Sequence, residues 1–537
     1  MRVLGIEGTA WAASAALFDS ATDSVTIESE AYQPDSGGLH PREAAEHMRE
    51  FVPEVLDRIL SAADGPIDAV AFSRGPGLGP CLRIAASAAR ATALTLDVPL
   101  VGVNHMVAHL EIGRHRSGFD APICLNASGA NAHVLAYRNG RYRMLGETMD
   151  TGVGNAIDKF TRHLGWSHPG GPKVEERARE GEYVDLPYVV KGMDFSFAGI
   201  SSAAQAAVDD GTPIADVCCG LQETVFAMLT EVAERALSLT GRDELVLGGG
   251  VGQNARLREM LATMCEARGA DFYAPEARFL RDNAGMIAVL GAKMAAAGDT
   301  LSVEDSSVRP DFRPDEVPVS WRAREAPPAA PGTGPVRGAE AVVDLDPDAG
   351  RVTKRRPSKA YRHPDLDARL RRDRTVLEAR LTSAARRHGV PTPVVFDVDV
   401  PARTLELEFV GGDDLRDALS APRVRAVAAH LATLHDAGLV HGDPTTRNVR
   451  VAPDQSPVAD VAPSAGRSYL VDFGLGYHST DVEDFAMDLH VLRGSVTGTA
   501  DDPEPLLDAA REAYAARGDP AVLDRLADVE GRGRYSD

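Results

Sequence analysis

The sequence is poor in lysine. Its positive charge comes almost entirely from arginine, because only six of its 57 basic residues are lysines, and its formal net charge is −22. A surface rich in Asp and Glu and poor in Lys stays hydrated where concentrated salt screens charge repulsion. The composition therefore predicts a protein of a salt-adapted, archaeal cytoplasm, and a genome whose GC bias favours Arg, Ala and Gly is the alternative.

Cysteines and long apolar runs are also scarce. The five cysteines are an odd number without zinc-type spacing, which predicts reduced thiols in a reducing compartment and argues against a disulfide scaffold. No apolar run approaches membrane-spanning length. Residues 1–14 lack a charged leader followed by an apolar segment and a cleavage site, so they read as a first strand. We therefore expect a cytoplasmic protein that has no membrane partner.

A chain of 537 residues is too long for one hydrophobic core. Residues 322–335 are rich in Pro, Ala and Gly, which is typical of a linker. Strands and helices alternate before this segment, whereas a basic island at 351–388 follows it, with thirteen Lys/Arg against four Asp/Glu. The pattern predicts a first domain at 1–321, a linker at 322–335 and a second domain at 336–537.

Two histidines of the first domain, His105 and His109, directly follow an apolar strand expected at 100–103. Their spacing places both imidazoles on one face of a helix. Asp282 opens another expected helix and offers a carboxylate. Two imidazoles and one carboxylate with open positions suit iron or zinc. The alternative is that both histidines are ordinary residues on the surface of a helix, since sequence spacing does not bring Asp282 near them.

Two glycine-rich turns frame these residues. GIEGTA follows the first strand, and LGGGVGQNARL joins a strand to a helix at 247–257. Glycines permit close approach of a nucleotide to the backbone, and a helix N-terminus favours anionic groups. The two turns together indicate a two-lobed architecture of the actin, sugar-kinase and Hsp70 type, with the nucleotide in the cleft.

Residues 1–321 resemble the tRNA threonylcarbamoyltransferase family in its archaeal and eukaryotic form. The motifs that carry the resemblance are, in order, GIEGTA, RGPGLGPCLR, VNHMVAHLE, GNAIDKFTRHLG, HPGGPKVEE, MDFSFAGI, LGGGVGQNARLREM, FLRDNAGMIA and FRPDEVPVSW. The resemblance implies an α/β domain with the two-lobed actin-like fold of the ASKHA ATPases. It also implies transfer of threonylcarbamoyl from threonylcarbamoyl-AMP to N6 of the adenosine beside the anticodon in ANN-reading tRNAs.

Carried over to this sequence, the resemblance assigns His105, His109 and Asp282 to one divalent metal, with iron favoured and zinc as the other choice. The expected positions around the threonylcarbamoyl-adenylate are Asn126, Ala127, Ser128, Gly129, Ala130, Asp158, Gly171, Glu175 and Asn254. One segment departs from the family. Archaeal members read YVSGGN where this chain reads NASGAN, so Asn126 replaces a tyrosine that can touch the metal. An amide oxygen is a weaker ligand than a phenolate, so we expect at most a weak metal contact from Asn126.

The second domain carries a phosphoryl-transfer pattern of its own. Asp443, then Asn448 five residues later, then Asp472 in Asp-Phe-Gly follow the order used by protein kinases. Asp443 is expected to orient the attacking hydroxyl or water as the catalytic carboxylate, while Asn448 and Asp472 hold Mg²⁺. Lys354, on an expected strand, would reach the ATP phosphates and pair with Glu378 from a helix.

Departures from protein kinases narrow this interpretation. The glycine-rich loop is reduced to RGAEAVV, HGD replaces HRD, and VEDFAMDLHVL follows DFG too closely to leave an activation segment. The domain resembles the small atypical kinase/ATPase of the KEOPS complex, which implies a small bilobal α+β kinase-like fold that binds ATP and Mg²⁺. The remaining ATP-binding positions are Gly338, Ala339, Glu340 and Ala341. The resemblance further implies tRNA, the small KEOPS subunits and a separate synthase of threonylcarbamoyl-AMP as partners.

Several interpretations stay open at this stage. The basic island and the GRGRY segment at 531–535 either bind tRNA phosphates or form salt bridges within the domain. Tyr361 and Tyr535 lie among the arginines and are candidates for stacking on bases. A signalling serine/threonine kinase behind an inactive nucleotide-binding scaffold is a rival function. A metallopeptidase is disfavoured, because HMVAH lacks the glutamate of HExxH.

Overall fold

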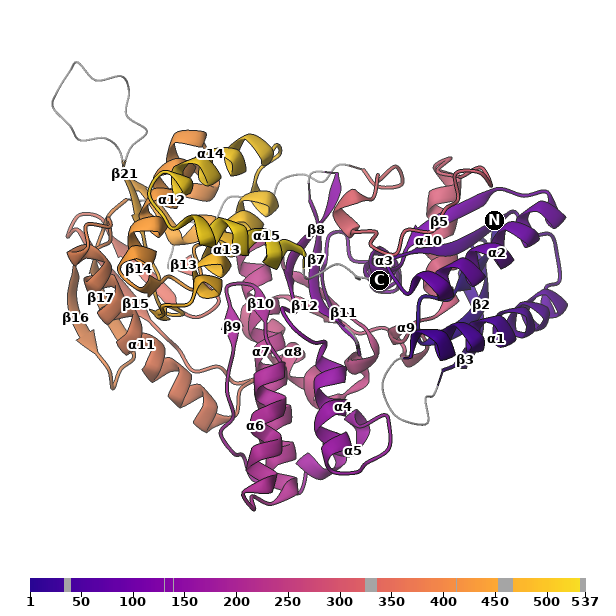
Figure 1. Cartoon of the computed structure of the whole chain (residues 1–537), viewed down its shortest axis with the longest axis horizontal. Helices are drawn as coiled ribbons and strands as arrows, with labels where there is room; N and C mark the ends of the chain where they lie inside the picture. Colours follow the sequence, from indigo (N-terminus) through magenta and orange to yellow (C-terminus); the bar gives the residue numbers. More distant parts are fainter. Residues whose placement is uncertain are drawn as a thin grey trace.

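The computed structural model shows three main β-sheets with helices around them (Figure 1). It describes residues 1–32, 40–129, 131–138, 140–323, 336–411, 413–452 and 467–531. The first two sheets are mixed and belong to the N-terminal part of the chain, whereas the third is antiparallel and follows residue 335. Most of the predicted linker lies outside the described residues.

The first sheet has the strand order β3-β2-β1-β4-β5. Its strands are β1 (Arg2–Glu7), β2 (Ala12–Asp19), β3 (Ser24–Ala31), β4 (Ala69–Gly75) and β5 (Leu100–Asn104). Leu4 and Ile6 of β1 pack on the face covered by α1 (Pro41–Ala62) and α2 (Gly79–Leu96), while Val3 packs on the face covered by α10 (Ala284–Ala296). Because both faces are covered, the strand reads as a continuous apolar run in the sequence.

The second sheet has the order β12-β11-β6-β7-β8. Its strands are β6 (Ile123–Ala127), β7 (Ala132–Arg138), β8 (Arg141–Glu147), β11 (Glu244–Gly248) and β12 (Asp271–Tyr273). The helices of this lobe are α4 (Val153–His163), α5 (Gly171–Ala178), α6 (Ala198–Asp209), α7 (Ile214–Thr240) and α8 (Ala255–Arg268). Two helix-flanked mixed sheets fit the predicted α/β, actin-like architecture of the first domain.

Helix α3 (His105–Ser117) lies between the two sheets. It packs on α10 of the first lobe and on β6 and β11 of the second. Its first turn is capped by Asn104, whose side-chain oxygen accepts a hydrogen bond from the Val107 N–H at 3.1 Å. The cap fixes where the helix begins, and the helix therefore presents His105 and His109 at the junction of the lobes.

The C-terminal part combines an antiparallel sheet with a helical region. The sheet has the order β13-β14-β15-β17-β16 and is formed by β13 (Val336–Arg337), β14 (Val342–Asp346), β15 (Arg351–Arg355), β16 (Val395–Asp399) and β17 (Thr404–Glu408). The helices are α11 (Pro364–Arg387), α12 (Ala421–Asp436), α13 (Val482–Thr499), α14 (Glu504–Ala515) and α15 (Pro520–Gly531). Helix α11 packs on β16 and β17, while α12 to α15 pack on one another.

Short elements complete both parts. They are β9 (Val190–Lys191), β10 (Asp194–Phe195), α9 (Ala277–Leu280), β18 (Asp413–Asp414), β19 (Leu439–Val440), β20 (Val449–Ala452), β21 (Arg467–Leu470) and β22 (Tyr477–His478), with single 3-10 turns at Gly250–Gln253, Pro314–Glu316, Leu415–Ala418 and Thr446–Asn448. Within the described ranges, the chain has no helix that is both long and apolar enough to cross a membrane.

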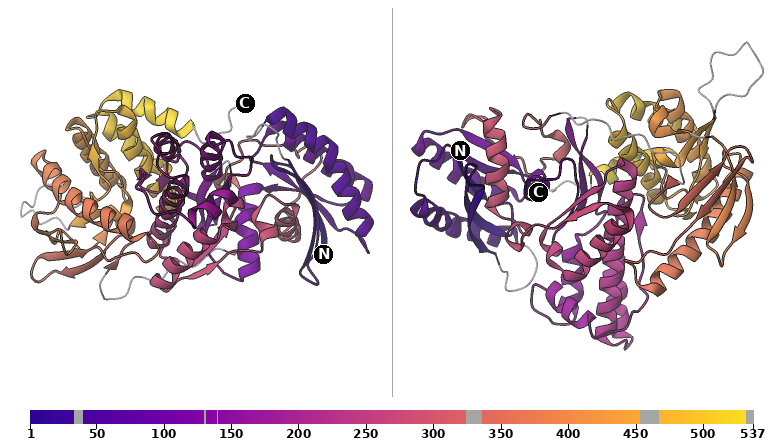
Figure 2. Two further views of the ribbon diagram at one scale, coloured as in Figure 1. Left: turned by 90° about the horizontal axis from the view of Figure 1, so that it is seen from below. Right: turned by 180° about the vertical axis from the view of Figure 1, so that it is seen from behind.

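The N-terminal and C-terminal parts are in direct contact, as the views in Figure 2 illustrate. Helix α13 packs on β8, and the Gly192 N–H donates to the Gly442 carbonyl at 2.9 Å. The Lys191 ammonium lies 2.8 Å from an oxygen of Asp484. The turn after β9 thus reaches the loop that carries the predicted catalytic Asp443, so the two parts share a boundary at a candidate site.

Candidate metal and nucleotide sites

The structure brings His105, His109 and Asp282 together. The Nε2 atoms of the two histidines lie 3.4 Å and 3.5 Å from the same oxygen of Asp282, and ligand atoms of all three lie within 4.8 Å of one another. The sequence predicts that Asp282 opens α10, but the helix begins two residues later, at Ala284. Asn283 caps that helix, which leaves the Asp282 carboxylate to face the histidines.

Glu7 supports this cluster from β1. Its Oε1 accepts hydrogen bonds from the backbone N–H and the hydroxyl of Thr9, at 2.7 Å and 2.6 Å, and its Oε2 lies 3.1 Å from His105 Nδ1. Burial lowers the pKa of His105, but Glu7 and Asp282 outweigh it and raise the pKa to about 10. The two carboxylates therefore stabilise a positive charge at this point, which can be a proton on His105 or a bound cation.

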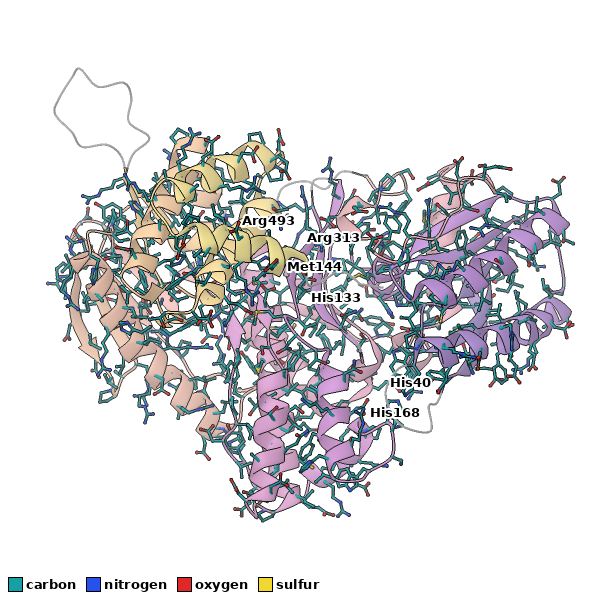
Figure 3. The ribbon with its side chains drawn as sticks, in the orientation of Figure 1. His40, His133, Met144, His168, Arg313 and Arg493 are labelled. Carbon is teal, nitrogen blue, oxygen red and sulfur yellow. The ribbon has the colours of Figure 1, made fainter. Side chains whose placement is uncertain are left out.

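Asn126 is the last residue but one of β6 and lies near His109. Its side-chain amide donates to Nε2 of His133 at 3.0 Å, and its buried Oδ1 has no hydrogen-bond partner among the described residues. His133, labelled on β7 in Figure 3, is buried, which lowers its pKa to about 3 and keeps the ring neutral. Together with two imidazoles and a carboxylate, this unsatisfied oxygen is a donor set that fits a divalent transition metal.

The loop after β6 packs on the start of α4. The Gly154 N–H donates to the Ser128 carbonyl at 3.2 Å, and the Asn155 N–H donates to the Gly129 carbonyl at 2.9 Å. A Cβ on Gly154 would come within 2.7 Å of the Gly129 Cα, so glycine is required for this close approach. Ala127 is buried at the end of β6. The predicted ligand position Ala130 lies outside the described residues.

Glu175 and Asn254 meet at the N-terminus of α8. Asn254 caps that helix by accepting from the N–H groups of Arg256 and Leu257, and Glu175 Oε1 accepts from the Ala255 N–H at 3.2 Å. A helix N-terminus stabilises negative charge, so this end of α8 suits a phosphate as well as the Glu175 carboxylate that now faces it.

Asp158 and Gly171 meet at a second helix N-terminus. Asp158 Oδ1 accepts from the Gly170 N–H at 2.8 Å, beside Gly171, the first residue of α5. Gly171 faces open space, because an added Cβ would meet nothing within 4 Å. His168, labelled in Figure 3, stacks on Trp11 of the first lobe, with ring centroids 5.7 Å apart. Asp158 and Gly171 therefore lie on the second lobe, close to a contact with the first.

A second site lies in the C-terminal part. Lys354 of β15 lies 2.8 Å from Glu378 of α11 and 2.7 Å from an oxygen of Asp472. Arg356 also pairs with Glu378. Burial raises the pKa of Asp472, but Lys354 and Arg356 outweigh it and hold the pKa below the ordinary value of a carboxyl group. Asp472 also has a φ of +66°, a strained value for a residue other than glycine and typical of functional sites.

Asp443 and Asn448 line the same cavity as Lys354 and Asp472. The Asn448 side chain donates to an oxygen of Asp443 at 2.9 Å and to its carbonyl at 2.8 Å. Burial raises the pKa of Asp443 to about 6, against the opposing effect of Arg235. Arg235 comes from α7 of the N-terminal part, and its Nη1 donates to Asp443 Oδ2 at 2.8 Å.

The loop predicted to cover ATP lines this cavity with Gly338, Ala339, Glu340 and Ala341. The Gly338 N–H donates to the Ala341 carbonyl at 2.9 Å, which closes a tight turn. The Glu340 side chain pairs with Arg362 at 2.8 Å and with Arg374 at 2.6 Å. Its carboxylate is therefore engaged by the basic island, and the backbone of the turn is the part available to a phosphate.

Arginines of the basic island at 351–388 form salt bridges within the chain. Arg362 and Arg374 are buried and pair with Glu231 of α7, at 2.8 Å and 3.0 Å. Tyr361 is 2% exposed, so the prediction that it stacks on bases is wrong, and its hydroxyl instead donates to Glu234. Tyr535 and most of the GRGRY segment lie outside the described residues. The structure thus favours the salt-bridge alternative for these arginines, although their partner Glu231 lies in the N-terminal part of the chain and not in the same predicted domain.

Three residues near these sites escaped the sequence analysis. Glu7 and His133 contact the predicted metal ligands, and Arg235 contacts the predicted catalytic aspartate. Glu7 lies inside GIEGTA, whose glycines predict only a turn, and a carboxylate at the end of a buried strand is the signal that points to it. Arg235 and Asp443 are 208 positions apart, so no local pattern connects them.

Comparison with known proteins identifies a family model that matches the first part of the chain and relatives that match its whole length. The family model of tRNA N6-adenosine threonylcarbamoyltransferase matches residues 21–289. The chain is 71% identical to a probable bifunctional tRNA threonylcarbamoyladenosine biosynthesis protein of Halobacterium salinarum, over 100% of this chain and 99% of that protein. Proteins of the same description from Haloarcula marismortui and Methanoculleus marisnigri are 64% and 50% identical and are matched over 100% and 98% of their lengths. The chain therefore belongs to the family of bifunctional tRNA threonylcarbamoyladenosine biosynthesis proteins, and its first part is a tRNA N6-adenosine threonylcarbamoyltransferase.

Proposed function

We propose that residues 1–321 transfer threonylcarbamoyl from threonylcarbamoyl-AMP to N6 of the adenosine beside the anticodon of ANN-reading tRNAs. The observation that carries this proposal is the convergence of His105, His109 and Asp282 between the two lobes. The Asn126 oxygen adds a fourth candidate ligand. Iron is the favoured metal and zinc the other choice, and a bound divalent cation would act as a Lewis acid on the carbamoyl carbonyl.

The residues of the second lobe hold the adenylate in this proposal. Asp158 and Glu175 accept hydrogen bonds from ribose hydroxyls, Gly171 lets the ligand lie against the backbone, and Asn254 holds the end of α8. The adenine amine of the tRNA attacks the carbamoyl carbon, the bond from that carbon to the phosphate oxygen of AMP breaks, and the amine releases one proton to solvent. AMP is a good leaving group, so no covalent intermediate on the protein is needed.

For residues 336–537 we propose a small, bilobal, kinase-like ATPase. Lys354, paired with Glu378, contacts the ATP phosphates, and Asn448 and Asp472 hold Mg²⁺. Asp443 orients the attacking water, and hydrolysis supports tRNA handling. We further propose that the chain works with the small KEOPS subunits and with a separate synthase of threonylcarbamoyl-AMP. Membership of the biosynthesis family favours these roles over a signalling kinase and over a metallopeptidase.

The transferase proposal is tested by reconstitution with threonylcarbamoyl-AMP, ANN-type tRNA and the partner subunits in concentrated KCl. The wild-type chain should form modified adenosine, detected by mass spectrometry of digested tRNA. His105→Ala should abolish the product and the bound metal while ATP hydrolysis continues. His115→Ala is the matched control, because His115 lies on the same helix but pairs with Asp23. Absence of product from the wild-type chain would refute the proposal.

The ATPase proposal has an independent test. Asp443→Ala should stop release of inorganic phosphate from ATP, because the attacking water loses the carboxylate that orients it. Binding of threonylcarbamoyl-AMP to the first domain should persist, which calorimetric titration can measure. Undiminished phosphate release by Asp443→Ala would show that Asp443 is not the catalytic carboxylate.

A further inference from the structure

Arg235 reaches from the transferase part into the cavity of the C-terminal part. It lies near the end of α7, has a side chain that is 10% exposed, and lines the cavity that Lys354, Asn448 and Asp472 also line. Its Nη1 donates to Asp443 at 2.8 Å, and its Nε donates to Glu231 at 3.1 Å. The candidate phosphoryl-transfer site is therefore composite, because one of its cations comes from the other domain.

The position of Arg235 is built by a buried network. Glu231, one helical turn before Arg235, accepts from Arg362 at 2.8 Å, from Arg374 at 3.1 Å and from the Tyr188 hydroxyl at 2.5 Å. The same two arginines pair with Glu340 in the loop expected over the phosphates. Glu231 and the two arginines thus connect the Arg235 side chain to that loop through a chain of ion pairs.

Arg235 keeps the positive charge that binding of a phosphate requires. Burial lowers the pKa of Arg235, but Asp443, Glu231, Glu340 and Asp472 outweigh it and keep the guanidinium charged. A guanidinium has five N–H donors in a planar fork that matches phosphate oxygens. Each terminal nitrogen carries two N–H groups, and the contacts described for Arg235 use one on each. A phosphate placed between Lys354 and Asp443 would meet this fork.

We propose that Arg235 is a catalytic residue of the C-terminal ATPase that contacts the γ-phosphoryl group of ATP and stabilises the charge that develops during transfer. This inference rests on the ATPase function proposed above. Arg235 passes from Asp443 to the phosphate oxygens when ATP binds, and Asp443 then faces the attacking water. The transferase domain thereby supplies an arginine finger to the ATPase domain within one polypeptide.

The step is a balanced hydrolysis. The water oxygen forms a bond to the γ-phosphorus, and the bond from that phosphorus to the β,γ-bridging oxygen breaks. The electron pair of the broken bond stays on ADP. One proton of the water passes to Asp443 and from there to solvent, and the other stays on the inorganic phosphate. ATP and water thus give ADP, inorganic phosphate and a proton, with no other reactant.

The test measures steady-state ATP hydrolysis by the full chain with Mg²⁺ in concentrated KCl. Arg235→Gln removes the charge, and Arg235→Lys keeps the charge but loses the fork. Both should lower kcat, Arg235→Gln by about 10²- to 10³-fold, as for loss of one preorganised donor to a transition state. The KM for ATP should change little. Mg-ADP with aluminium fluoride, which mimics the transferring phosphoryl group, should bind the variants more weakly than it binds the wild-type chain.

Lys191→Gln is the matched control. Lys191 also pairs with a carboxylate across the domain boundary, at Asp484, but it does not line the cavity. This variant should keep the wild-type kcat, and thermal unfolding of all three variants should show that the chains are folded. An Arg235→Lys variant that is folded and hydrolyses ATP at the wild-type rate would overturn the inference. A higher rate in Arg235→Gln would also overturn it, since Arg235 would then only cover Asp443.

The ATPase function and the role of Arg235 can be refuted separately. A wild-type chain that hydrolyses no ATP would overturn the ATPase function and this inference with it. If the wild-type chain hydrolyses ATP and the Arg235→Gln variant does so at the same rate, only the role of Arg235 is overturned.

Discussion

At the scale of single residues, Gly249 shows how backbone conformation shapes the candidate adenylate site. It follows β11 with φ +83° and ψ 157°, a region used almost only by glycine. A Cβ there would lie 2.2 Å from the Ala127 carbonyl oxygen and 2.6 Å from Asn126 Oδ1. The glycine thus allows the turn before α8 to lie against the loop after β6.

We predict that Gly249→Ala destabilises the chain and weakens binding of threonylcarbamoyl-AMP. The control is Gly269→Ala, at a left-handed helix end where an added Cβ meets nothing within 4 Å. That change should cost about 1–2 kcal/mol for conformation alone, and Gly249→Ala should cost more. Melting temperatures and calorimetric titration give the comparison. Equal effects of the two substitutions on melting and on binding would contradict this account of Gly249.

Asp194 should make the stability of the chain depend on pH, because burial raises the pKa of its carboxyl group to about 7. It accepts from the Glu147 N–H at 2.9 Å, and His490 lies 3.6 Å from its other oxygen. Between about pH 4 and pH 7 the folded chain holds a proton on Asp194 that the unfolded chain has lost. This group therefore adds stability as the pH falls from about 7 and takes it away as the pH rises.

Asp194→Asn, which mimics the protonated form, should raise the melting temperature more at pH 8 than at pH 5. One pKa unit corresponds to about 1.4 kcal/mol, and we expect a difference of at least that size. Asp64→Asn, at a side chain that is 87% exposed, should have little effect at either pH. A gain for Asp194→Asn that is larger at pH 5 than at pH 8 would refute the sign of this argument.

At the scale of secondary structure, α7 shows what the sequence reveals and what it does not. The order of strands, glycine turns and helices around His105, Asp443 and Asp472 was predictable, because each depends on local periodicity or a short motif. The burial of Glu231 and Glu234 and the small exposure of Arg235 were not predictable, because charged residues of a surface helix usually face solvent. Tyr361, Arg362 and Asp443, which contact these three residues, lie more than 100 positions away, so no local pattern connects them to α7.

We predict that Glu231→Gln is strongly destabilising, because it removes one of the two carboxylates that the buried Arg362 and Arg374 share and leaves only Glu340. Breaking one side of a buried ion pair costs about 3–5 kcal/mol. Glu180→Gln is the control, because its pair with Arg177 is exposed and such pairs contribute about 0–1 kcal/mol. Melting temperatures of the two variants at one salt concentration test this. If the melting temperatures of Glu231→Gln and Glu180→Gln are equal, the ion pairs of Glu231 do not stabilise the contact between the two parts of the chain.

At the scale of the whole molecule, the net charge of −22 opposes compactness while the domain boundary depends on ion pairs. Salt acts on the two differently. Surface charges repel one another through solvent, and that repulsion is screened once the Debye length falls to about 3 Å at 1 M salt. Pairs such as Arg362 with Glu231, both buried, are screened much less. Added salt should therefore weaken the repulsion among surface charges without breaking the buried ion pairs between the two parts of the chain.

The melting temperature should accordingly rise as KCl increases from about 0.1 M to about 1 M, and then rise less steeply, because screening is nearly complete at that concentration. Scanning calorimetry over a KCl series measures the curve. The same series on Glu231→Gln separates surface from boundary, since a variant without the central carboxylate should keep the salt dependence of the wild-type chain at a lower temperature. A wild-type melting temperature that falls with KCl would mean that exposed attractive pairs, rather than repulsion among the acidic residues, dominate the electrostatics of this protein.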